Sequence, residues 1–83
     1  MKYNFSIHAL EQLERRKISR SEIDTVVQHP RQIMKGKDYE IYQKIISNNN
    51  KKYLLRVFIN KTKQPPMVIT AYKTSNITKY YEG

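Results

Sequence analysis

The stretch Tyr53-Leu54-Leu55-Arg56-Val57-Phe58-Ile59 decides the fold. It contains leucines, β-branched residues and aromatics but no Gly or Pro, and polar Asn and Lys residues flank it. This pattern is typical of a central strand covered on both faces. Arg56 is the exception, because an unpaired guanidinium in the interior costs several kcal/mol. The sequence therefore requires for Arg56 either a carboxylate partner or a cleft that receives an anion.

Two helices are predicted before this strand. Ser6 is a favourable N-cap for a helix over residues 6–17, in which apolar residues recur at helical spacing. Ser19 and Glu22 have the spacing of a capping box, which predicts the start of a second helix over residues 20–28.

After the helices the apolar residues alternate with polar ones, which predicts strands. The expected strands cover residues 32–35, 39–47, 52–60 and 67–74. Helices followed by hairpin-connected strands predict one α+β domain over residues 1–83, with both helices packed on one face of a four-stranded antiparallel meander sheet. The tail from Thr74 onward fits either a short helix or an edge segment.

Charge and composition narrow the possible functions. The chain carries sixteen Lys and Arg against seven acidic residues, a net charge of +9, which favours a polyanionic partner such as nucleic acid. It has no Cys, which excludes disulfides and thiolate chemistry, and its two His and seven carboxylates predict neither a metal site nor a cofactor. No apolar run is long enough to span a membrane, so a soluble cytoplasmic protein is expected.

The candidate catalytic residues come from one strand face and one helix. Period-two alternation puts Arg56 on a face that Thr70 and Tyr72 of the next strand can share, so that a cation and two hydroxyls suit a phosphate. His8 is the second residue of the first predicted helix. It is either a general acid or base for RNA cleavage or an exposed first-turn residue without a role.

The remaining candidates are cations that could contact phosphates without reading sequence. The alternative is that they are ordinary helix-end and solvated charges. The predicted nucleic-acid-binding residues are Arg15, Arg16, Lys17, Arg20, Lys52 and Lys73. Bases could stack on Tyr72, or on Tyr80 and Tyr81, although Tyr72 is equally well explained as a sheet aromatic.

Several short motifs resemble those of the domain of unknown function 4258 family. They are Ser6-Ile7-His8-Ala9, Arg16-Lys17-Ile18-Ser19, Val26-Val27, Pro30-Arg31-Gln32-Ile33, Tyr53-Leu54-Leu55-Arg56-Val57 and Val68-Ile69-Thr70-Ala71-Tyr72. The chain departs from the pattern at Gln12, where the family often has Arg, and at Lys17, where it often has Gly. The first departure removes a cation from the helix, for which Arg15 or Arg16 could substitute.

The resemblance implies the fold of RelE-, ParE- and BrnT-like toxins in the barnase–colicin–RelE nuclease group. It further implies a metal-independent endoribonuclease of toxin-like type, in which an RNA 2′-hydroxyl attacks the neighbouring phosphate with help from His8, Arg56, Thr70 and Tyr72. The implied partners are RNA, including ribosome-bound mRNA or tRNA, and a small acidic antitoxin or immunity protein. Two alternatives are a non-catalytic basic nucleic-acid-binding module and a ParE-like toxin that acts by binding a protein.

Overall fold

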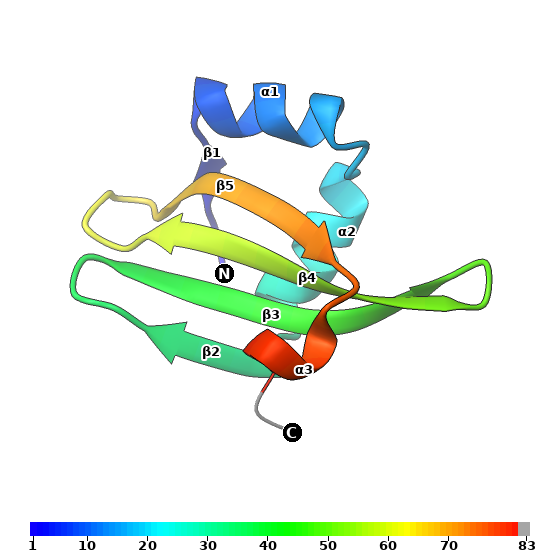
Figure 1. The fold of residues 1–83 in the computed structure, drawn as a ribbon. Helices are drawn as coiled ribbons and strands as arrows, with labels where there is room; N and C mark the ends of the chain where they lie inside the picture. Colours follow the sequence, from blue (N-terminus) through cyan, green and yellow to red (C-terminus); the bar gives the residue numbers. More distant parts are fainter. Residues whose placement is uncertain (82–83) are drawn as a thin grey trace.

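The computed structural model describes residues 1–81 and has three short helices and one sheet (Figure 1). The elements are β1 (Asn4–Phe5), α1 (Ile7–Arg15), α2 (Arg20–Gln28), β2 (Gln32–Lys35), β3 (Tyr39–Asn48), β4 (Lys51–Asn60), β5 (Met67–Thr74) and α3 (Ile77–Tyr80). The four strands expected from the sequence each lie within one residue of β2 to β5. The expected first helix is longer at both ends than α1.

The sheet corrects the predicted architecture. It has five strands in the order β1-β5-β4-β3-β2, and β1 pairs with β5 in parallel, so the prediction of a four-stranded antiparallel meander is wrong. The fifth strand is the two-residue segment Asn4–Phe5. Asn4 N donates to Pro66 O, and Ser6 N, just after the strand, donates to Val68 O. Two residues are too few to show a period, so the sequence pattern could not reveal this strand.

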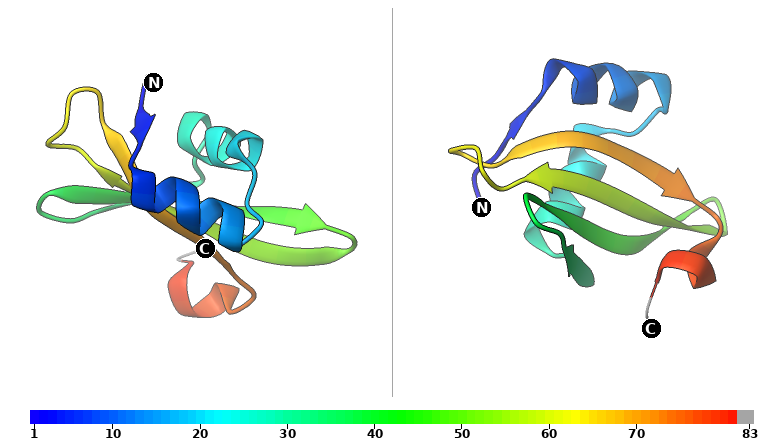
Figure 2. Two further views of the ribbon diagram at one scale, coloured as in Figure 1. Left: turned by 90° about the horizontal axis from the view of Figure 1, so that it is seen from above. Right: turned by 60° about the vertical axis from the view of Figure 1, so that its left-hand side comes forward.

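The hydrophobic core lies between the sheet and the first two helices. Leu55, Val57 and Ile59 of β4 are fully buried and pack in one cluster with residues of α1 and α2. Because side chains alternate along a strand, Leu54, Arg56 and Phe58 point to the other face. Figures 1 and 2 show α2 behind the sheet, α1 along the β5 edge, and α3 on the opposite face from α2.

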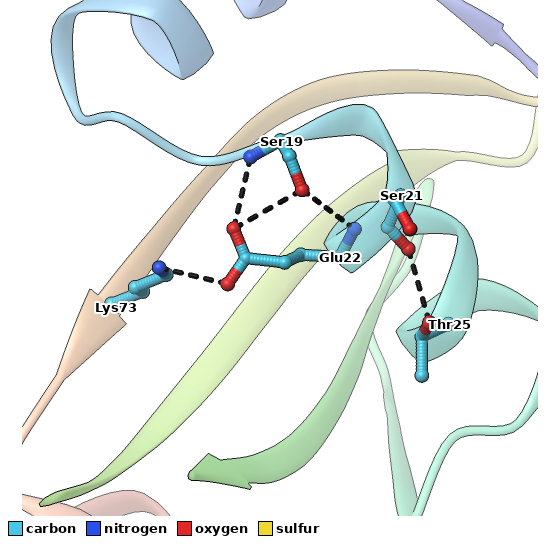
Figure 3. Close-up of polar contacts among 5 residues, drawn as sticks. All are labelled: Ser19, Ser21, Glu22, Thr25 and Lys73. Carbon is cyan, nitrogen blue, oxygen red and sulfur yellow. Dashed lines mark hydrogen bonds and ion pairs between the residues drawn. The ribbon is translucent and has the colours of Figure 1, made fainter. Parts of the chain in front are cut away.

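Local sequence signals fix the ends of the helices. The side chain of Ser6 accepts from Ala9 N at the start of α1, and Ser19 and Glu22 form the expected capping box at the start of α2 (Figure 3). Lys17, just after α1, has a φ of 55°. The bonds from Lys17 N to Glu14 O and from Ile18 N to Leu13 O form a Schellman motif, in which that left-handed position favours Gly.

The tail is a helix rather than an edge segment over the residues that the structure describes. α3 ends at Tyr80, and Gln43 Nε2 donates to the Tyr80 carbonyl while Arg31 Nε donates to the Tyr81 hydroxyl. These bonds hold the end of α3 against the sheet. The rest of the tail, residues 82–83, lies outside the described residues.

Candidate functional site

Arg56 lies in the middle of β4, on the sheet face away from α1 and α2, and only 7% of it is exposed. No carboxylate of residues 1–81 forms a salt bridge with it. Its Nε donates to Gln43 Oε1 at 2.9 Å, and its Nη1 donates to the Tyr72 hydroxyl at 2.6 Å. A weaker contact of 3.8 Å joins Nη2 to the Met34 sulfur. The charge is thus held by neutral acceptors rather than by an ion pair.

Aromatic rings supply the rest of the Arg56 environment. Its Cζ lies 4.4 Å from the ring centroid of Tyr80, 5.6 Å from that of Phe58 and 5.7 Å from that of Tyr72. A guanidinium at these distances is attracted by the negative faces of the rings, by up to about 2 kcal/mol when it is desolvated. The sequence predicted a carboxylate partner or a bound anion for Arg56. The structure instead surrounds its guanidinium with a cage of aromatic and neutral polar side chains, which are Met34, Gln43, Phe58, Tyr72 and Tyr80.

Gln43 ties this cage together. It is fully buried on β3, directly opposite Arg56 in the sheet register. Its Oε1 accepts from Arg56, while its Nε2 donates to Gln32 Oε1 at 2.8 Å and to the Tyr80 carbonyl at 3.1 Å. Arg56 therefore keeps its position through a residue that also holds α3.

The predicted catalytic group is only partly assembled. Arg56 and Tyr72 are directly opposite each other in the register, and Thr70 lies opposite Phe58 on the same face. The Thr70 hydroxyl, however, accepts at 3.4 Å from Nη1 of Arg16, the residue that ends α1. The structure thus brings together two pairs, Arg56 with Tyr72 and Arg16 with Thr70.

His8 joins neither pair. It is exposed in the first turn of α1, and its position is eight residues, about 12 Å along a helix axis, from Arg16. No hydrogen bond or ion pair connects His8 to Arg56, Thr70 or Tyr72 in the part of the chain that the structure describes. Of the four predicted catalytic residues, His8 therefore lies on α1. The other three, Arg56, Thr70 and Tyr72, lie on the sheet face away from α1 and α2.

The six predicted phosphate contacts differ in what they already bind. Arg16 Nη1 donates to the Ala71 carbonyl at 2.8 Å and so ties the end of α1 to β5. Arg20 lies over the Phe5 ring, 5.4 Å from its centroid. Arg15, Lys17 and Lys52 are exposed, and within residues 1–81 none of them forms a salt bridge. These three are the cations best placed to meet a phosphate.

Lys73 is held by an ion pair with Glu22. Its Nζ lies 2.9 Å from Glu22 Oε2, and Glu22 also accepts from Ser19 N in the capping box (Figure 3). Partial burial raises the pKa of Glu22, but the hydrogen bond from Ser19 and the charge of Lys73 outweigh it and lower that pKa below its usual value. Lys73 thus stabilises the start of α2 and is less available to a ligand than Lys52.

The sequence analysis named Tyr72 and Tyr80 but did not identify Phe58 and Tyr39 as site residues. Tyr39 and Phe58 have ring centroids 6.3 Å apart and an interplanar angle of 26°, and Phe58 and Tyr72 are 6.0 Å apart at 27°. Tyr72 also contacts Tyr80 edge-on at 6.4 Å. Strand periodicity alone puts Phe58 on the same sheet face as Arg56. Tyr39 lies on β3, diagonal to Phe58 on β4, and this contact depends on the register of the β3–β4 hairpin. Gln43 was missed for the same reason.

Among residues 1–81 no cluster of three or more His, Cys, Asp or Glu side chains could hold a metal ion. In the same part of the chain, no helix has the length and apolar composition needed to cross a membrane.

Fold and site together define a small basic α+β protein with a caged arginine on the sheet face away from α1 and α2. The chain belongs to the family named domain of unknown function (DUF4258), which matches residues 5–73. The resemblance noted in the sequence is thereby confirmed for the family. No curated protein and no solved structure matches the chain. The RelE-like fold consequently stays a prediction.

Proposed function

We propose that the protein is a cytoplasmic RNA-binding protein. The observation that carries the proposal is the grouping, at one end of the molecule, of exposed cations that form no salt bridge within residues 1–81. Arg15 and Lys17 lie at the end of α1, and Lys52 lies beside the β3–β4 turn. All views show the end of α1, the end of β5 and this turn on the same side (Figures 1 and 2).

The charge of the whole chain supports the same conclusion. A net charge of +9 on 83 residues attracts polyanions, and cations that release counterions from phosphates make affinity depend steeply on salt. The proposal places phosphates at Arg15, Lys17 and Lys52, with Arg20 at the border of the same surface.

The test is the salt dependence of RNA binding, measured by fluorescence anisotropy with a labelled RNA. The variant Arg15→Gln/Lys17→Gly/Lys52→Gln should weaken binding and reduce the log–log salt slope by about 2, because each single-strand phosphate contact contributes roughly 0.7. The control Lys2→Gln/Lys35→Gln/Lys63→Gln loses the same charge elsewhere and should change the slope much less. Equal effects of both variants would refute a localised site. No RNA binding, together with capture of an acidic protein, would favour the ParE-like protein-interaction toxin instead.

A second candidate function is a metal-independent endoribonuclease of toxin-like type. The observation that favours it is the 2.6 Å contact between Arg56 Nη1 and the Tyr72 hydroxyl. A guanidinium and a hydroxyl held together can stabilise charge that develops on a phosphate. In this reaction the 2′-oxygen attacks phosphorus, its proton goes to a base, and the departing 5′-oxygen takes a proton from an acid. A 2′,3′-cyclic phosphate remains.

The nuclease test is a time course on end-labelled RNA in EDTA, with ribosomes and tRNA as further substrates. Wild type is compared with Tyr72→Phe, which keeps the ring, and with His8→Ala, purified identically. Cleavage that Tyr72→Phe lowers by roughly 100-fold or more supports general acid–base chemistry at Tyr72. Loss of cleavage in His8→Ala assigns a role to His8 as well. Binding without cleavage of any of these RNAs leaves the protein a non-catalytic module.

A further inference from the structure

We propose that Tyr39, Phe58 and Tyr72 form a stacking row for the bases of single-stranded RNA. The row is defined by these three residues, and the inference rests on the proposed function as an RNA-binding protein. It adds a second surface, on the sheet face away from α1 and α2, which shares Lys52 with the surface formed by Arg15 and Lys17.

The rings of the row lie nearly parallel to one another. Neighbouring rings are tilted by only 26° and 27°, with centroids 6.3 and 6.0 Å apart. Tyr39, at one end, is 43% exposed, and Phe58 and Tyr72 are half-buried. The Tyr39 ring lies close over Gly36, where an added Cβ would come within 2.8 Å of the ring. The backbone thus leaves room for the ring in this position.

Charge around the row complements a phosphate chain. A guanidinium has five N–H groups, and Arg56 uses three of them, toward Gln43, Tyr72 and Met34. The other two have no hydrogen-bond partner within residues 1–81. Lys52 belongs to the same face of β4, because it lies four positions before Arg56 and side chains alternate between the faces. A strand with bases on the rings can therefore direct its phosphates toward Arg56 and Lys52.

The row should bind single-stranded RNA in preference to duplex RNA. Aromatic side chains stack on any base whose face is accessible, and their preference between sequences is weak. In a duplex the base faces are covered by their neighbours, so only the phosphates would remain for contact. A cavity of about 290 Å³ beside Tyr39, lined by residues 36–40 with Lys61 and Thr62, extends the same end of the row.

The test uses a uridine-rich single-stranded RNA that carries one 2-aminopurine, together with a hairpin duplex of equal charge. Binding is followed by anisotropy, and stacking by quenching of the 2-aminopurine. We expect quenching on the wild type and single-strand affinity above duplex affinity. Phe58→Leu and Tyr39→Leu should each weaken single-strand binding about tenfold or more while leaving duplex binding unchanged.

Matched controls separate the row from the fold. Tyr53→Leu removes a half-buried aromatic of β4 whose position in the strand alternation is on the other face, and should bind as wild type. Gly36→Ala displaces the Tyr39 ring without removing an aromatic and should weaken single-strand binding. Equal affinity for both RNAs, or an unchanged affinity in Tyr39→Leu, would overturn the row and leave the proposed function intact. If neither RNA binds, both the stacking row and the proposed RNA-binding function are refuted.

Discussion

Gln12 offers the clearest test of the core. It is 8% exposed on α1, and its Oε1 is the single buried side-chain N or O atom without a hydrogen-bond partner among residues 1–81. A buried acceptor that loses water and gains no partner costs about 1–3 kcal/mol. The change Gln12→Met replaces the amide by a thioether of similar length and removes this cost.

The expected gain is about 1–2 kcal/mol in the free energy of unfolding. Met and Gln have nearly equal helix propensity, so the backbone contributes little to the difference. The buried side chain of Gln12 lies on the same helix surface as Ala9 and Leu13, where an apolar group is favourable. For a domain of this size the gain corresponds to a rise in Tm of roughly 4–16 °C.

The assay is urea denaturation at pH 7, with thermal unfolding followed by circular dichroism. Gln12→Glu has the same length and places a charge at the buried position, so it should lower the urea midpoint. A Gln12→Met midpoint equal to or below that of wild type, with an unchanged m value, would refute the reasoning. It would mean that Oε1 has a hydrogen-bond partner in solution.

Two further changes act on the ends of the helices. Lys17→Gly should raise the unfolding free energy by about 0.5–1 kcal/mol in urea denaturation, because Lys17 has a φ of 55°, which costs a non-Gly residue about 1–2 kcal/mol, partly offset by the entropy of Gly. Arg15→Gly loses the same charge inside α1 and should destabilise, so equal effects would contradict this account. The pKa of Glu22 is raised by burial but lowered overall by Ser19 and Lys73, so Glu22 stabilises the fold above pH 4.5, and this contribution disappears as the pH falls through the lower folded value. Glu22→Gln should therefore be less stable than wild type at pH 7 in urea denaturation, and the difference should narrow as the pH is lowered below 4.5. A difference that stays constant would exclude the proposed titration.

The sequence predicts the helix ends and hairpins well because their signals are local. Ser19 and Glu22 need only three residues between cap and partner, and both bonds are present. Asn49 and Asn50 have φ values of 52° and 66°, which are the left-handed angles expected of a tight Asn turn. Each of these features depends on residues a few positions apart.

Features that depend on distant parts of the chain escaped the sequence. Asn4–Phe5 becomes a strand only because residues 66–68 supply partners more than sixty positions later. The separation of His8 from Arg56 has the same origin, since periodicity gives the face of each element but not which side of the sheet α1 covers. Gln43 meets Arg56 through the register of β3 and β4.

The cage around Arg56 links stability to the proposed binding surface. The sheet face away from α1 and α2 carries a buried cation that no described carboxylate neutralises, and neutral acceptors and rings compensate it instead. A well-packed apolar residue at such a position is often as stabilising as a buried charge. The stability of the fold alone therefore gives little reason for an arginine at position 56. An anion that approaches the row would meet two unused N–H groups in a site of low dielectric, where their attraction is stronger than in water. In that arrangement the cage keeps the guanidinium desolvated and oriented, so the cost of ordering it is met during folding and not at the moment of binding.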